Sequence, residues 1–261
     1  MKNILPEFGK KTLIMGILNA TPDSFSDGGF FYSVEAAKNH AAEMIRDGAD
    51  IIDIGAESTR PNFTPITAEE EISRLEKIIP AIKNFGVPIS IDTYKAEVAE
   101  FALNLGVDII NDVHGLQGDN FKMASVAKKF NAPVIVMHNE KIFDNVVDDI
   151  KKFFNQTLEI CKNFGIDTNK IIFDVGIGFN KTQEENLTVL KNLHEFKNFP
   201  LMLGVSRKSV IGYATGFDIK NRDEATGAIC VLGISQGVDI VRVHNVKMIS
   251  KMCRMADFLT R

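Results

Sequence analysis

Three polar side chains of this 261-residue chain, Asp92, Asn111 and Asp174, stand directly after short, mostly apolar runs. A carboxylate can accept paired N–H groups from a flat, amidine-like heterocycle, and an amide can both donate and accept hydrogen bonds. Charge-assisted bonds of this kind contribute roughly 1.5 to 3 kcal/mol each. The three residues are therefore candidate contacts for a flat nitrogen heterocycle. The alternative is that they only cap the ends of strands.

A second set of side chains could bind an anion. Arg60, Arg207, Lys208, Arg242 and His244 fall in or beside the segments that follow the second, seventh and eighth apolar runs. Because Arg242 and His244 are two residues apart in one run, the alternation of a strand sends both to the same side. Cationic groups in the last loops of a β/α barrel are a common anion site, so a phosphate-bearing substrate is expected.

The elements that must position these residues repeat eight times. Short β-branched runs occupy residues 12–19, 50–57, 88–93, 108–113, 132–138, 171–177, 200–206 and 239–245. Amphipathic segments lie between and after them, at residues 34–47, 68–84, 95–104, 120–130, 146–164, 183–196, 222–236 and 246–258. Alternating strands and helices of this kind predict an α/β protein with a parallel sheet, closed as a (β/α)8 TIM barrel.

No linker or low-complexity tract interrupts the series, so residues 1–261 are expected to form a single domain, with residues 1–11 a short N-terminal extension. In a β/α barrel the active site lies at the C-terminal ends of the strands. Most of the predicted strands finish there in a polar residue: Asn19, Asp53 with Glu57, Asp92, Asn111, His138, Asp174, Ser206 and His244. Their convergence on one rim favours a functional role over local capping.

Composition excludes several classes of partner. The net charge is −4 and no run of like charges stands out, which argues against a nucleic-acid or membrane surface. No stretch approaches the roughly 20 apolar residues that a membrane-spanning helix needs. Three widely separated cysteines suggest neither a disulfide framework nor a Cys-x-x-Cys motif. We therefore expect a cytoplasmic protein with reduced cysteines and small-molecule substrates.

A metal ion is suggested by the segment after the first apolar run. Residues 19–29 are long, polar and end in two glycines, as functional loops of compact barrels often do. Asn19, together with Asp27, could supply hard oxygen ligands for Mg²⁺ bound jointly with phosphates, because that ion takes only one or two protein ligands at such sites.

Taken together, the motifs closely resemble those of the dihydropteroate synthases, a family of pterin-binding barrels. The resemblance spans nearly the whole chain in the right order. It is carried by residues 16–29, Glu57-Ser-Thr-Arg-Pro61, Ile91-Asp-Thr93, Asn111-Asp-Val113, Met137-His138, residues 174–181, Ser206-Arg-Lys-Ser209 and Arg242-Val-His244. The first two motifs are highly specific, because related pterin-binding barrels lack these loops.

The resemblance implies an activity and a role for each matching residue. The enzyme would condense a dihydropterin-methyl diphosphate with 4-aminobenzoate, giving dihydropteroate and pyrophosphate. The pterin would be held by Asp92, Asn111, Asp174, Lys208 and Arg242, the last stacked on the ring. The diphosphate would be held by Asn19, Thr59, Arg60, Arg242 and His244, with Asn19 binding Mg²⁺. The aminobenzoate pocket, where sulfonamides compete in this family, would be shaped by Phe25, Pro61, Phe179, Lys208 and Ser209. Asp92, Lys208, Arg242 and His244 would be the catalytic residues, and a homodimer is expected.

A few positions depart from the family pattern. Val175 and Asn180 stand where Pro and Gly are common, Asn62 follows Pro61 where Gly is frequent, and Ala56 precedes Glu57 where Gly is also common. None of these is a side-chain ligand in the family. We therefore expect the departures to alter loop shape and inhibitor affinity rather than to abolish activity.

Two other functions are compatible with a pterin-binding barrel. One is a methyltransferase that passes a methyl group from a reduced folate to a corrinoid protein. The other is a catalytically silent subunit that binds the pterin diphosphate yet releases no pyrophosphate. The matching loops with Asn19, Arg60 and Lys208 favour the synthase over both.

Overall fold

Eight parallel strands close into one barrel in the computed structural model of the chain, which describes residues 8–20, 29–57 and 64–261. Each strand pairs with its sequence neighbour, and β1 closes the ring on β8 through Met15 opposite Arg242. The strands are β1 (Leu13–Asn19), β2 (Ile51–Gly55), β3 (Ile89–Asp92), β4 (Ile109–Asp112), β5 (Val134–Met137), β6 (Ile171–Asp174), β7 (Leu201–Leu203) and β8 (Ile240–Val243). The predicted (β/α)8 barrel is confirmed.

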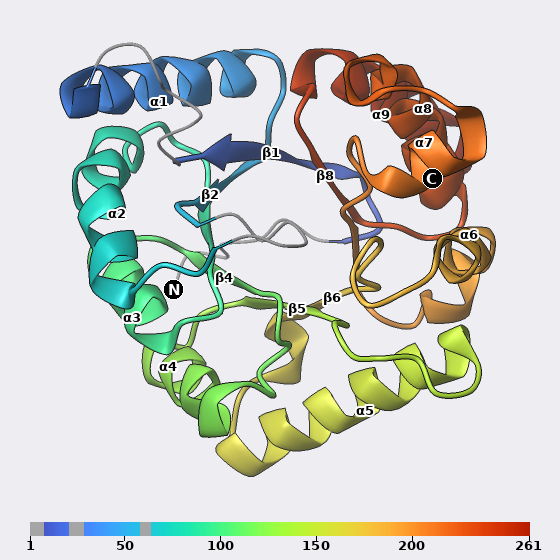
Figure 1. The fold of residues 1–261 in the computed structure, drawn as a ribbon, viewed down its shortest axis with the longest axis horizontal. Coiled ribbons are helices and arrows are strands. Elements are labelled where there is room, and N and C mark those ends of the chain that lie inside the picture. Colours follow the sequence, from blue (N-terminus) through green and yellow to red (C-terminus); the bar gives the residue numbers. More distant parts are fainter. Residues whose placement is uncertain (1–7, 21–28, 58–63) are drawn as a thin grey trace.

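Helices form a ring around the strands (Figure 1). They are α1 (Gly29–Arg46), α2 (Ala68–Ile82), α3 (Ala96–Asn104), α4 (Lys122–Phe130), α5 (Val146–Phe164), α6 (Gln183–Lys191), α7 (Ser209–Thr215), α8 (Asp223–Ser235) and α9 (Val246–Thr260). Short 3-10 turns complete the connections, at η2 (Asp119–Phe121), η3 (Thr168–Lys170), η4 (Leu193–Phe196) and η5 (Ile219–Asn221). In the part of the chain so described, no helix is long and apolar enough to cross a membrane.

Two helices differ from the sequence prediction. α7 was not predicted, because a seven-residue segment with a glycine at its centre is too short to show a helical period. α1 begins at Gly29, five residues before the predicted start at residue 34. The prediction missed this first turn because its residues are Gly, Phe, Phe and Tyr, which have modest or poor helix propensity. The prediction was wrong at both places, and each lies close to the active face of the barrel.

The interior of the barrel is built in layers by the alternation of the strands. The lower layer is aliphatic and fully buried, and Phe8 packs against it from below; its members are Leu13, Met15, Ile51, Ile109, Ile135, Ile172, Met202 and Ile240. Two residues further along a strand, the next side chain points to the same interior. On β2, β4, β6 and β8 that next residue is polar, namely Asp53, Asn111, Asp174 and Arg242. The fold therefore places charged groups directly above an apolar floor.

This floor generates the first prediction. Ile135 is fully buried in the lower layer, so Ile135→Ala leaves a cavity and should lower the free energy of unfolding by about 2–5 kcal/mol. Urea denaturation followed by circular dichroism measures the change. The matched control is Ile219→Ala, whose side chain is 50% exposed and whose loss should cost within about 0.5 kcal/mol. Equal effects of the two substitutions would contradict a packed interior.

Candidate active site

Arg242 lies at the centre of the barrel mouth, between two carboxylates from other strands. Its Nε donates to Asp53 Oδ2 at 2.6 Å, and its Nη2 donates to Asp92 Oδ2 at 2.5 Å. Asn111 Nδ2 donates to the same Asp53 oxygen at 3.1 Å. Strands β2, β3, β4 and β8 thus contribute one polar side chain each to a continuous network.

Burial and neighbouring charges both shift the pKa values of the charged groups in this network. Burial raises the pKa of Asp92 to about 7 against the opposing effect of Arg242, and the neighbouring Asp53 adds to the rise. Burial alone would lower the pKa of Arg242, but the two carboxylates outweigh it and raise that pKa. Asp53 Oδ1 and Asp92 Oδ1 are buried without a hydrogen-bond partner among the residues that the structure describes. Buried acceptors left open in this way are suited to N–H donors of a ligand.

Asp174 and Lys208 lie together on the β6 and β7 side of the mouth. Asp174 Oδ1 accepts the Gly176 N–H at 2.8 Å, and the Lys208 ammonium donates to the carbonyl of Ile177. A Cβ atom at Gly204 would lie 3.4 Å from Asp174 Oδ2 and 3.9 Å from Lys208 Nζ, so both groups border the same small residue. Burial raises the pKa of Asp174 and lowers that of Lys208 to about 8, and each group partly offsets the shift of the other.

The loop after β6 is fixed from inside by Lys181. Its ammonium lies 2.9 Å from His138 Nδ1, 3.1 Å from the Gly176 carbonyl and 3.2 Å from the Phe179 carbonyl. Burial lowers the pKa of His138 to about 3, so the imidazole is neutral and its Nδ1 can accept. Gly176 has φ +69°, and a Cβ there would lie 1.9 Å from the His138 carbonyl oxygen. The loop requires glycine at that position, and Lys181 acts as its internal brace.

The departures from the family pattern in this loop have visible consequences. Asn180 takes a positive φ of 46°, which asparagine tolerates better than most residues. Its Nδ2 donates to the Asn139 main-chain oxygen at 2.8 Å and to Asn139 Oδ1 at 3.1 Å. The loop after β6 is therefore tied to the end of β5 by a side chain that a glycine would lack. Val175 is fully buried in the hydrophobic core.

The predicted aminobenzoate residues that the structure describes lie beside Lys208. The Phe179 ring centroid is 4.7 Å from Lys208 Nζ, a cation–π contact. Ser209 begins α7 directly after Lys208, and its exposed Oγ accepts from Gln183 Nε2 at 3.3 Å. Phe25 and Pro61 lie outside the described residues, as do the predicted ligands Asp27, Thr59 and Arg60.

The predicted anion ligands separate into two groups. His244 Nδ1 lies 2.9 Å from Ser206 Oγ, which orients its ring at the end of β8. Arg207, by contrast, directs Nε and Nη2 to Asp223 at 2.7 and 2.8 Å, so its fork is occupied by a carboxylate of the protein. Grouping Arg207 with the anion-binding cations was therefore wrong.

Asn19 ends β1 at the rim. It is exposed after six buried residues of the same strand. Among residues 8–20, 29–57 and 64–261, no group of three His, Cys, Asp or Glu side chains is arranged to hold a metal ion.

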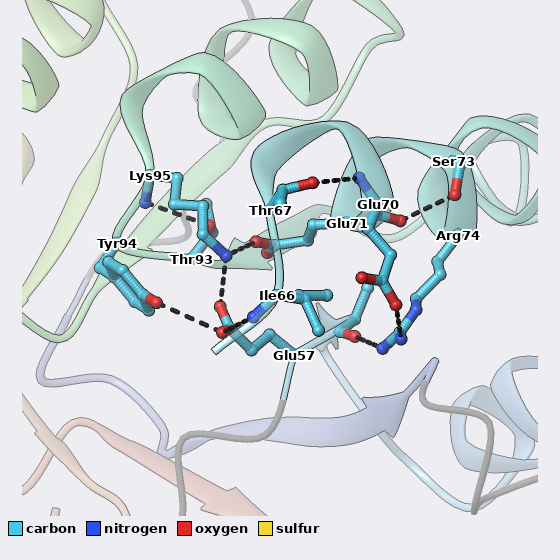
Figure 2. A network of polar contacts seen from close by, with 11 residues as sticks. Glu57, Ile66, Thr67, Glu70, Glu71, Ser73, Arg74, Thr93, Tyr94 and Lys95 are labelled. Atoms are coloured by element: carbon cyan, nitrogen blue, oxygen red, sulfur yellow. Dashed lines mark hydrogen bonds and ion pairs between the residues drawn. The ribbon is translucent and has the colours of Figure 1, made fainter. Parts of the chain in front are cut away.

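A buried ion network flanks the mouth on the β2 and β3 side (Figure 2). Lys95 Nζ lies 2.5 Å from Glu57 Oε2 and 2.7 Å from Glu71 Oε2. Glu57 Oε1 also accepts the Ile66 N–H at 2.9 Å and the Tyr94 hydroxyl at 3.3 Å. One carboxylate therefore fixes the chain on both sides of residues 58–63.

Two residues of these networks were given no role in the sequence analysis, namely Asp53 beside Arg242 and Glu71 beside Lys95. Asp53 is two residues beyond buried Ile51, which is the same alternation that placed Arg242 and His244. Glu71 is fully buried on α2 in helical register with Leu75 and Ile78, so it falls on an otherwise apolar stripe. An acidic residue in a core position signals a buried partner, here Lys95.

Comparisons with known proteins agree with this geometry. The family model described as pterin binding enzyme matches residues 15–244. The dihydropteroate synthase of Clostridium beijerinckii is 48% identical over 259 residues, covering 97% of this chain and 96% of its own length. A crystal structure of dihydropteroate synthase from Clostridium difficile in the presence of pteroic acid has a TM-score of 0.95 and 48% identity, covering 98% of this chain and 100% of that one.

A third relative is more distant in sequence. The dihydropteroate synthase of Xanthomonas albilineans, solved with 4-aminobenzoic acid, has a TM-score of 0.90 and 34% identity, covering 95% of this chain and 93% of that one. Identity and coverage at this level, together with the polar network at the barrel mouth, establish that the chain belongs to the pterin-binding enzymes and, within them, to the dihydropteroate synthase family.

Proposed function

We propose that this enzyme condenses (7,8-dihydropterin-6-yl)methyl diphosphate with 4-aminobenzoate, giving 7,8-dihydropteroate and pyrophosphate in folate biosynthesis. The observation that carries the proposal is the pair of buried acceptors at the barrel mouth, Asp53 Oδ1 and Asp92 Oδ1, which have no partner in the described part of the chain. A pterin presents the paired ring and amino N–H groups that such acceptors need.

The pterin would lie across the Arg242 guanidinium. The edge nitrogens Nε and Nη2 are held by Asp53 and Asp92, which fixes the plane of the group and leaves its flat face for stacking on a ring. Asp92 and Asp174 would accept N–H groups of the pterin, with the open Asp53 oxygen and Asn111 beside them. Lys208 would supply a cation at the same end of the ring.

The diphosphate would be bound by His244 and Arg242 together with Thr59, Arg60 and Asn19. When the methylene C–O bond breaks, its electron pair leaves with pyrophosphate, and preorganised cations stabilise that developing charge. The pterin delocalises the positive charge left on the methylene carbon. The arylamine nitrogen then forms the C–N bond and loses one proton to solvent. No covalent bond to the protein is needed at any stage.

The aminobenzoate would enter along the loop after β6. Phe179 and Lys208 offer an aromatic face and a cation, suited to a benzoate ring and its carboxylate, with Ser209 at the start of α7. Phe25 and Pro61 would complete this pocket. Lys181 and Asn180 brace the loop from both sides, so the pocket wall is preorganised before the substrate arrives.

Mg²⁺ is proposed as the cofactor. Asn19 fits this ion, because it presents a hard amide oxygen at an exposed rim position beside a site for phosphates. Asp27 would be its second protein ligand. When bound, the ion would add positive charge to the leaving diphosphate.

An exposed apolar surface on α8 and α9 bears on the assembly of the protein. α8 is apolar nearly all round, yet Leu232 on it is 62% exposed, and α9 beside it exposes Met255, Phe258 and Leu259. An apolar surface of this kind favours a homodimer, which sedimentation of the full chain would distinguish from a monomer.

Cys161, Cys230 and Cys253 are all free and buried, which supports a cytoplasmic location.

The first test is a pyrophosphate-release assay with both substrates, run with and without Mg²⁺. Pyrophosphate should appear only when the pterin diphosphate and 4-aminobenzoate are both present. A chelator should slow its release, and added Mg²⁺ should restore it. Binding of the pterin diphosphate without release of pyrophosphate would identify a silent subunit instead, and methyl transfer to a corrinoid protein would identify a methyltransferase.

Substitutions at the mouth should separate function from folding. Lys208→Ala and Asp92→Asn should each lower kcat at least about a hundredfold, because each removes a charge that contacts the pterin. Urea unfolding should stay cooperative in both variants. The matched controls are Lys191→Ala and Asp148→Asn, which change exposed residues of α6 and α5. Near-normal turnover in either mouth variant would refute its proposed role.

The pH dependence of kcat/KM for the pterin diphosphate should be bell-shaped. Below the raised pKa of Asp92, about 7, the carboxyl is protonated and stops accepting from the pterin, so kcat/KM falls as pH falls. Above the lowered pKa of Lys208, about 8, the ammonium loses its charge, so kcat/KM falls as pH rises. Lys208→Arg should remove the alkaline limb, because a guanidinium stays protonated. An alkaline limb that persists unchanged in this variant would assign it to another group.

A further inference from the structure

The first turn of α8 holds the loop that carries Lys208. Asp223 accepts the Arg207 fork at 2.7 and 2.8 Å, and Thr226 Oγ1 accepts the Arg207 main-chain N–H at 3.2 Å. Arg222 Nη1 donates to the Arg207 carbonyl at 3.0 Å and to the Lys208 carbonyl at 3.3 Å. The main-chain N–H and carbonyl of residue 207 and two of its guanidinium nitrogens are therefore tied to the N-cap and first turn of α8.

The same carboxylate also reaches the loop after β8. Asn245 Nδ2 donates to Asp223 Oδ2 at 3.0 Å, and Asn245 is the residue that follows His244. Its own Oδ1 accepts the Met248 N–H at 3.2 Å, which caps α9. Asp223 therefore joins two loops through Arg207 and Asn245. The sequence neighbours of these residues are Lys208 and His244, which would face the proposed substrate.

Arg207 needs this support because its backbone is strained. Its φ is +59°, a left-handed conformation that is unfavourable for residues other than Gly, Asn or Asp. The turn at Arg207 directs the chain from the end of β7 to Lys208 and the start of α7. If the side-chain fork were released, the strained turn could relax and Lys208 would leave the Ile177 carbonyl and the Phe179 ring.

The burial and charge of the Arg207–Asp223 pair suit it to holding this turn in place. The Asp223 side chain is 15% exposed and the Arg207 side chain 36% exposed, so the fork is partly shielded from water. The hydrogen bond from Arg207, against the opposing effect of burial, lowers the pKa of Asp223, which keeps the carboxylate ionised at neutral pH. A bidentate arginine–carboxylate pair fixes orientation as well as distance.

We propose that Asp223 is a positioning residue of the enzyme, which holds Lys208 in place through Arg207 and His244 in place through Asn245. The inference rests on the proposed function only for the roles of Lys208 and His244. The geometry of the clamp is independent of any substrate.

Asp223→Asn tests the clamp with little change of shape. An amide cannot accept both arms of the guanidinium, so the fork opens on one side. We expect kcat/KM for the pterin diphosphate to fall at least about tenfold, with cooperative unfolding retained. Glu224→Gln is the matched control, because it removes one negative charge from the same first turn at an exposed position. It should behave as the parent enzyme.

Two further measurements separate positioning from general destabilisation. Acetic anhydride labelling over a pH series, read by peptide mass spectrometry, should show Lys208 becoming reactive at a higher pH in Asp223→Asn than in Glu224→Gln, because only the free amine reacts and burial lowers the pKa of Lys208 to about 8 while the clamp holds it. Arg207→Gln should reproduce the kinetic loss, and the double variant should lose little more than either single variant, since both act through one pair.

The outcomes are distinct. If the parent enzyme releases no pyrophosphate, the proposed function fails, while the Lys208 labelling still tests the clamp. If the parent is active and Asp223→Asn matches Glu224→Gln in kinetics and labelling, the positioning role is overturned. Additive losses in the double variant would also overturn it. Thermal destabilisation with unchanged labelling of Lys208 would assign Asp223 to fold stability alone.

Discussion

The contact of Arg242 with Asp53 and Asp92 is the interaction on which the barrel mouth depends. Two carboxylates buried side by side would repel each other and would lose several kcal/mol of hydration apiece, so they need a cation that reaches both. A guanidinium does so with two separate nitrogens, at 2.6 and 2.5 Å. One oxygen of each acid, Asp53 Oδ1 and Asp92 Oδ1, has no partner in the described part of the chain, which suits both to the N–H donors of the proposed substrate.

The apolar floor makes this arrangement stable. Side chains such as Ile51, Ile172 and Ile240 fill the barrel below the charged layer and keep water from approaching it from that side. In the described part of the chain, the charges are therefore closed off on the side of the floor. The low dielectric that makes the carboxylates costly to bury is also what strengthens their hydrogen bonds to a ligand. A more stable mouth, with every oxygen paired inside the protein, would bind its substrate less well.

Most of the fold was predictable because β/α units carry a strong local signal. Glycines between a helix and the next strand show this: Gly48, Gly86, Gly106 and Gly237 follow α1, α2, α3 and α8, and all four have φ between +85° and +107°. Strand ends placed Asp92, Asn111 and Asp174 at the barrel mouth, and strand alternation placed Arg242 there. The helical partners of Arg207 and Lys95, Asp223 and Glu71, were not predicted, because nothing in a sequence pairs a loop cation with a helical carboxylate. Such pairs depend on how the helices dock, which periodicity does not specify.

The residues that escaped prediction share a physical role. Asp223, Glu71 and Lys181 each use a buried or half-buried charge to hold a loop at the barrel mouth rather than to face the substrate. Loops of a β/α barrel have no sheet neighbours to satisfy their backbone groups, so their shape must come from side chains of adjacent elements. Charged side chains suit this task because they reach far and bind several partners at once. The precision of the mouth therefore depends on a second layer of ionisable side chains, which lie in the first turns of helices or in the loops beside them and are recognisable only once the barrel has closed.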